Sequence, residues 1–206
     1  MLRNTVFLLV LLSSISAIAD ETHIARFEES ARPKNWSVNT GYWEPKEGVL
    51  VCRELEADQH AAASRWQVPL SDGVITCRLK FAGAKGFHIG FDPAVGQLDK
   101  KGHLYSLVIL PQSVSIKKHK DKADEKSKDE TLGTAKFEPG SDWIDIELQT
   151  AGDDVVATLK QGAKQVEVKG HDASFHVAKP TVVFRAMGGD ALLDDVQVKV
   201  TKSGLK

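Results

Sequence analysis

The feature that most constrains this chain is a long series of short apolar runs separated by turn residues. From Trp36 onward, runs of about four to nine residues rich in Val, Ile, Phe and Trp alternate with Gly, Pro and Asp, and none keeps the 3.6-residue period of a helix for long. We predict strands over residues 35–38, 42–44, 49–53, 63–68, 73–81, 86–91, 104–110, 113–119, 143–150, 154–160, 165–168, 181–186 and 192–200. Such a series without helices predicts an all-β fold, either a two-sheet antiparallel sandwich or a barrel.

Alternation inside single runs favours the sandwich. In the run 143–148, Ile144, Ile146 and Leu148 point to one side of the strand, whereas Asp145 and Glu147 point to the other. Burial of one such apolar side chain contributes about 1.5 to 3 kcal/mol, and a one-residue slip would move the whole set into water. Each sheet is therefore expected to have one dry face and one wet face.

The first 19 residues are typical of a secretory signal peptide. A basic start at Arg3 is followed by the apolar run 6–12 and by the small-residue exit Ala17-Ile18-Ala19, so cleavage is expected after Ala19. The apolar run is shorter than the ~20 residues that a membrane-spanning helix needs, so no integral membrane anchor is expected. The prediction is a secreted or periplasmic protein with one domain over residues 20–206.

The charge balance limits the range of partners. The chain has 27 basic and 28 acidic residues and a net charge of -1, so there is no overall field to attract nucleic acid or an acidic membrane. Residues 117–131 concentrate charges of both signs without a large apolar side chain. We predict a solvated loop there, joining two strands.

The two cysteines, Cys52 and Cys77, lie in separate predicted strands, and alternation places both on the core side. If the two strands are neighbours, a disulfide across this loop would add about 3 kcal/mol of stability. Two buried free thiols are the alternative.

The order of features along the chain resembles a known family. The stretches Asn35-Trp36-Ser37-Val38-Asn39, Lys85-Gly86-Phe87-His88-Ile89-Gly90-Phe91 and Asp194-Asp195-Val196-Gln197-Val198 stand in the order found in concanavalin A-like jelly-roll domains of bacterial secreted proteins. Within that class, the chain resembles the group of 3-keto-disaccharide hydrolases that is similar to family 16 glycosidases. The resemblance implies a concanavalin A-like lectin/glucanase or laminin G-like sandwich and a carbohydrate partner. Trp36 and Trp43 are expected to be core residues.

The catalytic motif of family 16 is not intact. A glycosidase of this type needs two carboxyl groups across the sugar, and a Glu-x-Asp-x-Glu strand places them on one face. The nearest stretch is Trp143-Ile144-Asp145-Ile146-Glu147, in which Trp143 stands at the nucleophile position. We expect Asp145 and Glu147 to face solvent on an outer strand, and whether the chain is an enzyme stays open.

Another set of polar residues lies opposite apolar neighbours. His88 and Asp92 share one face of a strand whose other face carries phenylalanines, and Arg185 alternates with core residues in a late strand. These three would supply a general base and a cation and are the candidate catalytic residues, and His103 and Tyr105 are candidate substrate-binding residues, with Tyr105 as an aromatic platform. Each is also compatible with an ordinary solvent-facing position. His60, in a predicted loop, is a weaker candidate.

No cofactor is expected. Jelly rolls of this class often carry a structural calcium at the rim, and Asp194 with Asp195, or Asp153 with Asp154, could contribute oxygens, although paired aspartates beside turns are common without metal. Two functions follow from these observations. The first is a secreted carbohydrate-active domain that binds or processes a glycan on its concave face, and the second is a non-catalytic laminin G-like module that binds a glycan or a protein.

Overall fold

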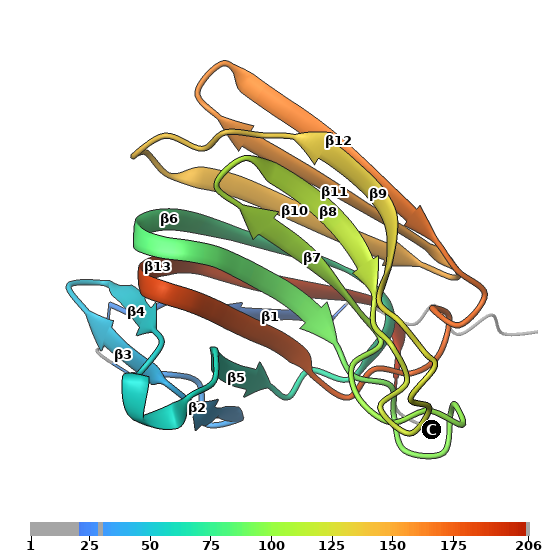
Figure 1. Cartoon of the computed structure of the whole chain (residues 1–206). Coiled ribbons are helices and arrows are strands. Elements are labelled where there is room, and N and C mark those ends of the chain that lie inside the picture. The colour runs from blue at the N-terminus through green and yellow to red at the C-terminus, as the bar shows by residue number, and fades with distance from the viewer. Residues whose placement is uncertain (1–20, 29–30, 205–206) are drawn as a thin grey trace, which may run out of the picture.

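The structure, a computed structural model, describes residues 21–28 and 31–204, so the predicted signal peptide lies outside the described residues. Thirteen strands make up most of this part of the chain (Figure 1). They are Glu21–Ala25 (β1), Trp36–Thr40 (β2), Tyr42–Lys46 (β3), Val49–Arg53 (β4), Ala62–Trp66 (β5), Leu70–Phe91 (β6), Tyr105–Leu110 (β7), Ser113–Lys118 (β8), Glu130–Lys136 (β9), Ile144–Ala151 (β10), Asp154–Gln161 (β11), Lys164–His171 (β12) and Val182–Ser203 (β13). The helical content of the described ranges is one 3-10 turn, Glu56–Asp58. None of their helices is long and apolar enough to cross a membrane.

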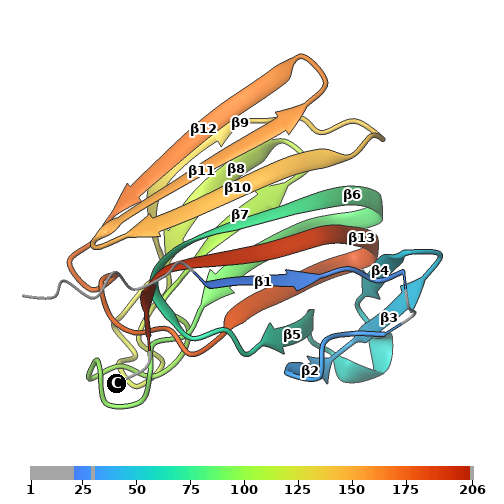
Figure 2. The same ribbon diagram turned by 180° about the vertical axis from the view of Figure 1, so that it is seen from behind.

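Hydrogen bonds connect the thirteen strands into one sheet that folds over on itself. The C-terminal half of β6 and the N-terminal half of β13 belong to a front sheet with the order β9-β8-β7-β6-β13-β5-β2, which faces the viewer in Figure 1. The other halves of β6 and β13 belong to a back sheet that continues through β10, β11 and β12 on one side and β1 on the other (Figure 2). All these pairs are antiparallel. The predicted two-sheet antiparallel jelly roll is confirmed.

Each of the two long strands replaces two shorter predicted strands. The runs 73–81 and 86–91 are continuous in β6, and 181–186 and 192–200 are continuous in β13. The bend between sheets contains Gly83 and Gly188, which have φ angles of +112° and +75°, together with register shifts around Gly188 and Asp190. Glycine adopts these angles without steric cost, so the chain turns the corner while the pairing continues.

The core fills the space between the two sheets. In β10 the burial alternates strictly: Ile144, Ile146 and Leu148 are buried, and Asp145 and Glu147 are exposed, as predicted. In the front sheet, the ring of Trp36 stacks on Phe184, with 5.0 Å between centroids and 4° between planes. Trp36 and Trp43 are 6% and 1% exposed, so both are core residues, as predicted.

The two cysteines are free thiols in this structure. Both point into the core as predicted, and the Cys52 thiol lies 3.1 Å from the carbonyl oxygen of Ala191. Their strands are not neighbours, however, because β4 and β6 pair with opposite edges of β13. Because β13 lies between β4 and β6, the backbones of these two strands are about 9.6 Å apart, whereas a disulfide tolerates at most ~7 Å between Cα atoms. Burial raises the pKa of both thiols above the usual range, to about 12 for Cys77.

A buried lysine fastens the loop before β13. The Lys179 side chain is fully buried, and its Nζ donates hydrogen bonds to the carbonyl oxygens of Ser71, Phe175 and Val177 at 2.7, 2.6 and 3.0 Å. The backbones of Lys179 and Leu70 exchange two further hydrogen bonds. Burial lowers the pKa of Lys179 to about 8, against the opposing charge of Asp72. The loop 172–181 is thereby attached to the start of β6.

Candidate functional site

The candidate site lies on the outer face of the front sheet. Along β6, Phe87, Ile89 and Phe91 enter the core, so His88 and Gly90 project outward on the opposite face, with Asp92 just past the strand end. His88 pairs in register with Val108 of β7 on one side and with Arg185 of β13 on the other. We call this surface, around Arg65, His88, Asp92, His103, His119 and Arg185, the histidine face.

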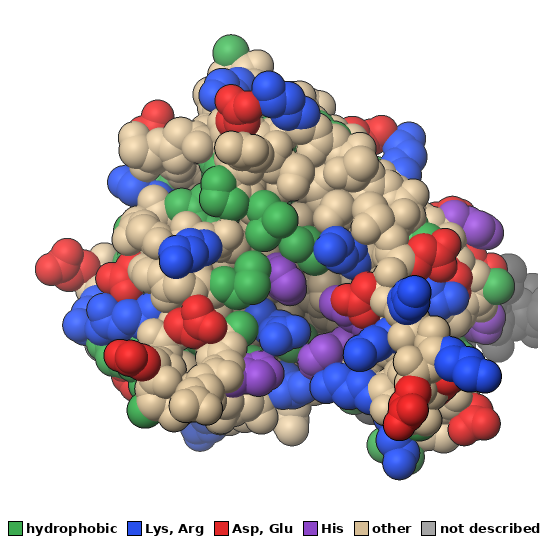
Figure 3. Space-filling model, in the orientation of Figure 1, with side chains coloured by type: hydrophobic (Ala, Val, Ile, Leu, Met, Phe, Trp, Pro, Cys, Tyr) green, Lys and Arg blue, Asp and Glu red, His purple; other side chains and the backbone are tan. Residues whose placement is uncertain are grey.

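The histidine face is recessed. Figure 3 shows histidine side chains gathered among Lys and Arg side chains in the middle of this face, next to apolar groups. Val108 and Val183 also project outward, outside the core cluster, yet each is only 3% exposed because its neighbours cover it.

Asp92 binds two of the basic side chains. One carboxylate oxygen lies 2.5 Å from Nδ1 of His103, and the other accepts a hydrogen bond from Nε of Arg65 at 3.0 Å. Arg65 also donates to Oδ1 of Asn39 at 2.5 Å, so its guanidinium is held at both ends. Burial by itself raises the pKa of Asp92, but the hydrogen bond and charge of His103 and the charge of Arg65 outweigh it, so the pKa lies below its usual value. Asp92 is therefore a structural anion that orients Arg65 and His103.

His119 lies beside this group, at the end of β8. Its Nε2 is 2.8 Å from Oγ of Ser106, its Nδ1 is 3.6 Å from a carboxylate oxygen of Asp129, and its ring centroid is 5.7 Å from that of His103. Burial lowers the pKa of His119 to about 4, against the charge of Asp129. A Cβ at Gly90 would approach Oγ of Ser106 to 2.3 Å, so this glycine leaves the space that Ser106 occupies. His119 is thus a neutral imidazole at neutral pH.

His88 and Arg185 have no partners. Both ring nitrogens of His88 and Nε of Arg185 are buried without a hydrogen bond. Burial lowers the pKa of His88 to about 3, and the nearby charges of Arg185, His119, Lys117 and His103 act in the same direction. Burial and the charge of Arg65 also lower the pKa of Arg185. Buried polar atoms are rarely left unpaired in proteins, so His88 and Arg185 are the candidate ligand-binding residues of this face.

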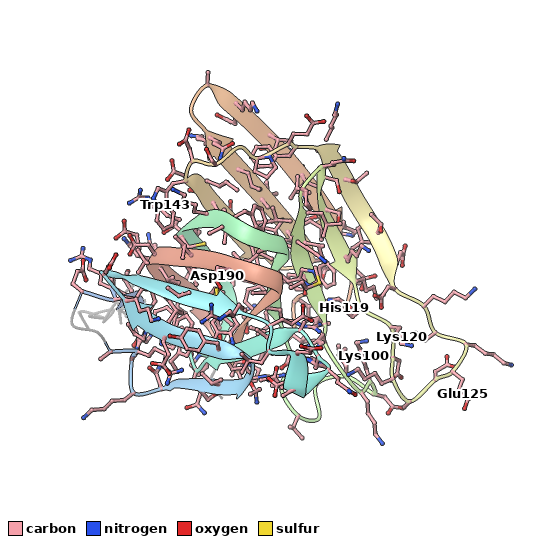
Figure 4. All side chains as sticks on the ribbon, turned by 60° about the vertical axis from the view of Figure 1, so that its left-hand side comes forward. Lys100, His119, Lys120, Glu125, Trp143 and Asp190 are labelled. Atoms are coloured by element: carbon pink, nitrogen blue, oxygen red, sulfur yellow. The ribbon has the colours of Figure 1, made fainter. Side chains whose placement is uncertain are left out.

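The charged run borders the histidine face. We predicted a loop over residues 117–131; β8 continues to Lys118 and β9 begins at Glu130, so the connecting segment is 119–129. Nζ of Lys100 donates to the carbonyl oxygens of His119 and Lys120 at 2.7 and 2.6 Å. In Figure 4, Lys100 and Lys120 lie beyond His119, and Glu125 lies farther out. Two loops, 92–104 and 119–129, are therefore tied together at the rim of the face.

The structure brings together most of the predicted site residues. His88, Asp92, His103 and Arg185 lie on the histidine face, whereas Tyr105 does not. The Tyr105 side chain is fully buried in the core, with its ring centroid 4.2 Å from that of Phe175. In this position Tyr105 cannot act as a platform for a sugar. His60 is exposed in the loop after the 3-10 turn, with its Nδ1 2.7 Å from the carbonyl oxygen of Ala61.

Sequence reasoning missed Arg65 and His119. Arg65 is the one charged residue in the otherwise small and apolar run Ala62–Trp66, and that isolation is a usable signal. His119 gave no signal because it lies in the charged run 117–131, where its neighbours in sequence are also polar. Both reach Asp92 or His103 only through pairing between segments far apart in the sequence.

A separate groove crosses the outer face of the back sheet. It has a volume of about 410 Å³ and is lined by Thr76, Cys77, Arg78, Asp145, Ile146, Glu147, Thr158, Lys160, Gln165, Asp195 and Gln197. Asp145 and Glu147 face solvent, as expected, on the sheet opposite to the histidine face, but their strand β10 is not an outer strand, because it pairs with β11 on one side and β6 on the other. The Arg78 guanidinium lies over the ring of Trp143, 4.7 Å from its centroid.

The aspartates considered for calcium contact basic side chains. Asp194 and Asp195 lie 3.7 and 3.6 Å from Arg78, while Asp153 and Asp154 contact His176 and His171. Across the described ranges, no three His, Cys, Asp or Glu side chains form a group that could hold a metal ion. Carboxylates already facing cations do not fit a calcium site, and the calcium stays a prediction that nothing here supports.

Comparisons with protein families and with curated protein sequences find no match. Solved structures do match. A lectin, UEA-II complexed with galactose, superposes with a TM-score of 0.60 and 11% identity over 92% of this chain and 100% of the lectin. A protein of unknown function with a galectin-like fold from Bacillus subtilis superposes with a TM-score of 0.60 and 12% identity, over 87% of this chain and 97% of that protein. The GH43 protein BlXynB from Bacillus licheniformis superposes with a TM-score of 0.58 and 12% identity, over 86% of this chain and 39% of that protein.

These similarities define the fold. The chain is a concanavalin A-like sandwich with the jelly-roll architecture of lectins and galectin-like proteins. Identities this low carry no function from one protein to another, so the function must be argued from the site.

Proposed function

We propose that this protein is a carbohydrate-binding β-sandwich whose binding site is the histidine face. The observation that carries the proposal is the pair His88 and Arg185 on the outer face of the front sheet, where both ring nitrogens of His88 and Nε of Arg185 are buried without hydrogen-bond partners. A saccharide offers many hydroxyl and ring oxygens that can pair with such groups. The similar structures, which include a lectin complexed with galactose and a protein with a galectin-like fold, support this class of ligand.

The histidine face supports binding better than catalysis. Removal of a proton from a sugar requires a general base whose pKa lies near the working pH. His88 has a pKa of about 3 and His119 of about 4, so both are weak bases. Asp92 is already occupied by His103 and Arg65. The proposal is therefore a non-catalytic module, in which these groups position a glycan.

Titration calorimetry against a panel of oligosaccharides tests this proposal. We expect the wild-type protein to bind at least one of them and Asp92→Asn to bind at least about tenfold more weakly, because Arg65 and His103 lose the anion that orients them. Glu147→Gln on the back sheet is the matched control and should bind like the wild type. Equal affinity of Asp92→Asn and wild type would contradict the assignment of the site.

The resemblance to 3-keto-disaccharide hydrolases provides the second candidate, which a direct assay separates from the first. The protein is incubated with a 3-keto-glucoside, and release of the free sugar is followed. We expect no release. Release by the wild type that His88→Ala and Asp92→Ala both abolish would replace the binding module by an enzyme acting at the same face.

We also propose that the chain is exported, because its first 19 residues have the charge and hydropathy pattern of a signal peptide. Expression in a bacterium, followed by N-terminal sequencing of the protein from the periplasm or medium, should give a first residue of Asp20. Recovery only inside the cell with an intact Met1 would contradict export.

A further inference from the structure

The charges of the histidine face are unbalanced around Arg185. Within residues 21–28 and 31–204, Arg185 makes no hydrogen bond and no ion pair, and its Nε is buried. A guanidinium that is partly withdrawn from water normally has an acceptor or an opposite charge beside its buried nitrogen, because its desolvation is otherwise uncompensated. Arg185 is half-buried without a hydrogen-bond acceptor, and the one acid whose charge acts on it, Asp92, is bound to other residues.

Among the described residues, no carboxylate on this face is free to pair with Arg185. Asp92 is the acid whose charge acts on Arg185, but both of its oxygens already bind His103 and Arg65. Asp129 accepts a hydrogen bond from the backbone N–H of Lys120 and faces His119. The remaining charges that act on Arg185 and His88 are positive, with Arg65 near the former and Lys117 near the latter.

The face also lacks the usual means of holding a neutral sugar. Sites for small ligands are lined mostly by apolar and aromatic side chains with a few polar groups. The described aromatic residues on the strands of the front sheet all belong to the core: Trp36, Trp66, Phe87, Phe91, Tyr105 and Phe184. Without an aromatic platform, binding on this face must depend on polar and charged contacts.

We infer that the glycan bound at the histidine face is acidic, and that its anionic oxygens pair with the guanidinium of Arg185 beside His88. The anionic group is a carboxylate of a uronic acid or a sulfate ester, since both present oxygens in the geometry that a guanidinium binds through two hydrogen bonds. His88, the in-register neighbour of Arg185, is neutral at neutral pH, so the guanidinium is the charged group that selects an anion. This inference rests on the proposed function and names the class of its ligand.

Matched saccharides test the inference by calorimetry. The probes are tetragalacturonic acid, the same tetramer with every carboxyl group methyl-esterified, a sulfated neocarratetraose, and sodium sulfate. We expect the acid, the sulfated tetramer or both to bind at least about tenfold more tightly than the methyl ester, with an affinity that falls as salt is added. Arg185→Gln should remove this difference. Arg78→Gln, on the back sheet, should keep it.

Arg185→Gln is expected to fold, because the guanidinium of Arg185 makes no hydrogen bond or ion pair that Gln would break. Circular dichroism checks this, and Arg185→Lys, which keeps the charge but loses the paired donors, should bind with intermediate affinity. Equal binding of the acid and the methyl ester, or unchanged binding by Arg185→Gln, overturns the inference and leaves the proposed function standing. Sodium sulfate binding as tightly as the saccharides also overturns it. Binding of no saccharide at all, neutral or acidic, refutes the proposed function itself.

Discussion

Mild acid is expected to destabilise this protein through His88. In the folded state its pKa is about 3, because burial and the surrounding cations disfavour the imidazolium. In the unfolded chain a histidine has a pKa of about 6.5. The folded pKa is therefore the lower of the two, so between these values the unfolded state binds a proton that the folded state does not. The contribution of His88 to the free energy of unfolding is therefore fully present above the unfolded pKa and is lost as the pH falls toward the folded pKa.

The size of the effect follows from this linkage. At pH 5 the unfolded state gains about 2 kcal/mol from protonating His88, whereas at pH 7 it gains only about 0.2 kcal/mol. His119, with a pKa of about 4, adds a similar amount, although the two rings influence each other and the sum is below twice the single value. We expect the free energy of unfolding to fall by about 2 to 4 kcal/mol from pH 7 to pH 5.

Urea unfolding at the two pH values measures this fall. His88→Gln removes the titrating group, so its stability should fall by about 2 kcal/mol less than that of the wild type. His171→Gln is the control, since His171 is exposed and its pKa is raised by Asp154, and it should not reduce the fall. If His88→Gln loses as much stability as the wild type on acidification, the buried, neutral state assigned to His88 is wrong.

Three further outcomes are expected. Lys179→Met should lower the free energy of unfolding by roughly 2 to 5 kcal/mol in urea titrations at neutral pH, because three buried carbonyl oxygens lose their donor; an unchanged value would contradict that role. Tyr105→Phe should lower the free energy of unfolding by about 1 kcal/mol, since the buried hydroxyl lies beside the Thr150 side chain, and should leave glycan binding intact because Tyr105 is a core residue; weaker binding would show that Tyr105 belongs to the site. A reducing agent should not shift the melting temperature, because Cys52 and Cys77 are free thiols; a drop on reduction would show a disulfide.

Local alternation predicted which side of a strand each residue occupies. His88 and Asp92 share the outer face because they stand at even spacing along and just past one strand. The same rule failed for His103 and Tyr105, which are also two residues apart. Strand β7 begins at Tyr105, so His103 lies in the preceding loop, where side-chain parity no longer holds. Tyr105 consequently enters the core while His103 reaches Asp92.

Partners across strands were beyond the reach of the sequence. Arg65 binds Asp92 from 27 residues away, and only the pairing of β5 with β13, and of β13 with β6, places them together. The same limit applies to the cysteines, whose core-side positions were predicted but whose separation by β13 was not. The turn residues Gly188-Gly189-Asp190 predicted a break between two strands, whereas they form a bend within the continuous strand β13.

The two bent strands determine how this protein can be assembled. β6 and β13 pair with each other along nearly their whole length, yet even their nearest paired residues, Phe91 and Val182, are about 90 residues apart in the chain. Neither sheet can be completed before this long loop closes, because each contains half of both strands. Folding is therefore expected to be slow and all-or-none, and a cut within either strand would disable both sheets at once. Insertions in the loops 92–104 and 119–129, by contrast, would change the rim of the histidine face without disturbing that closure.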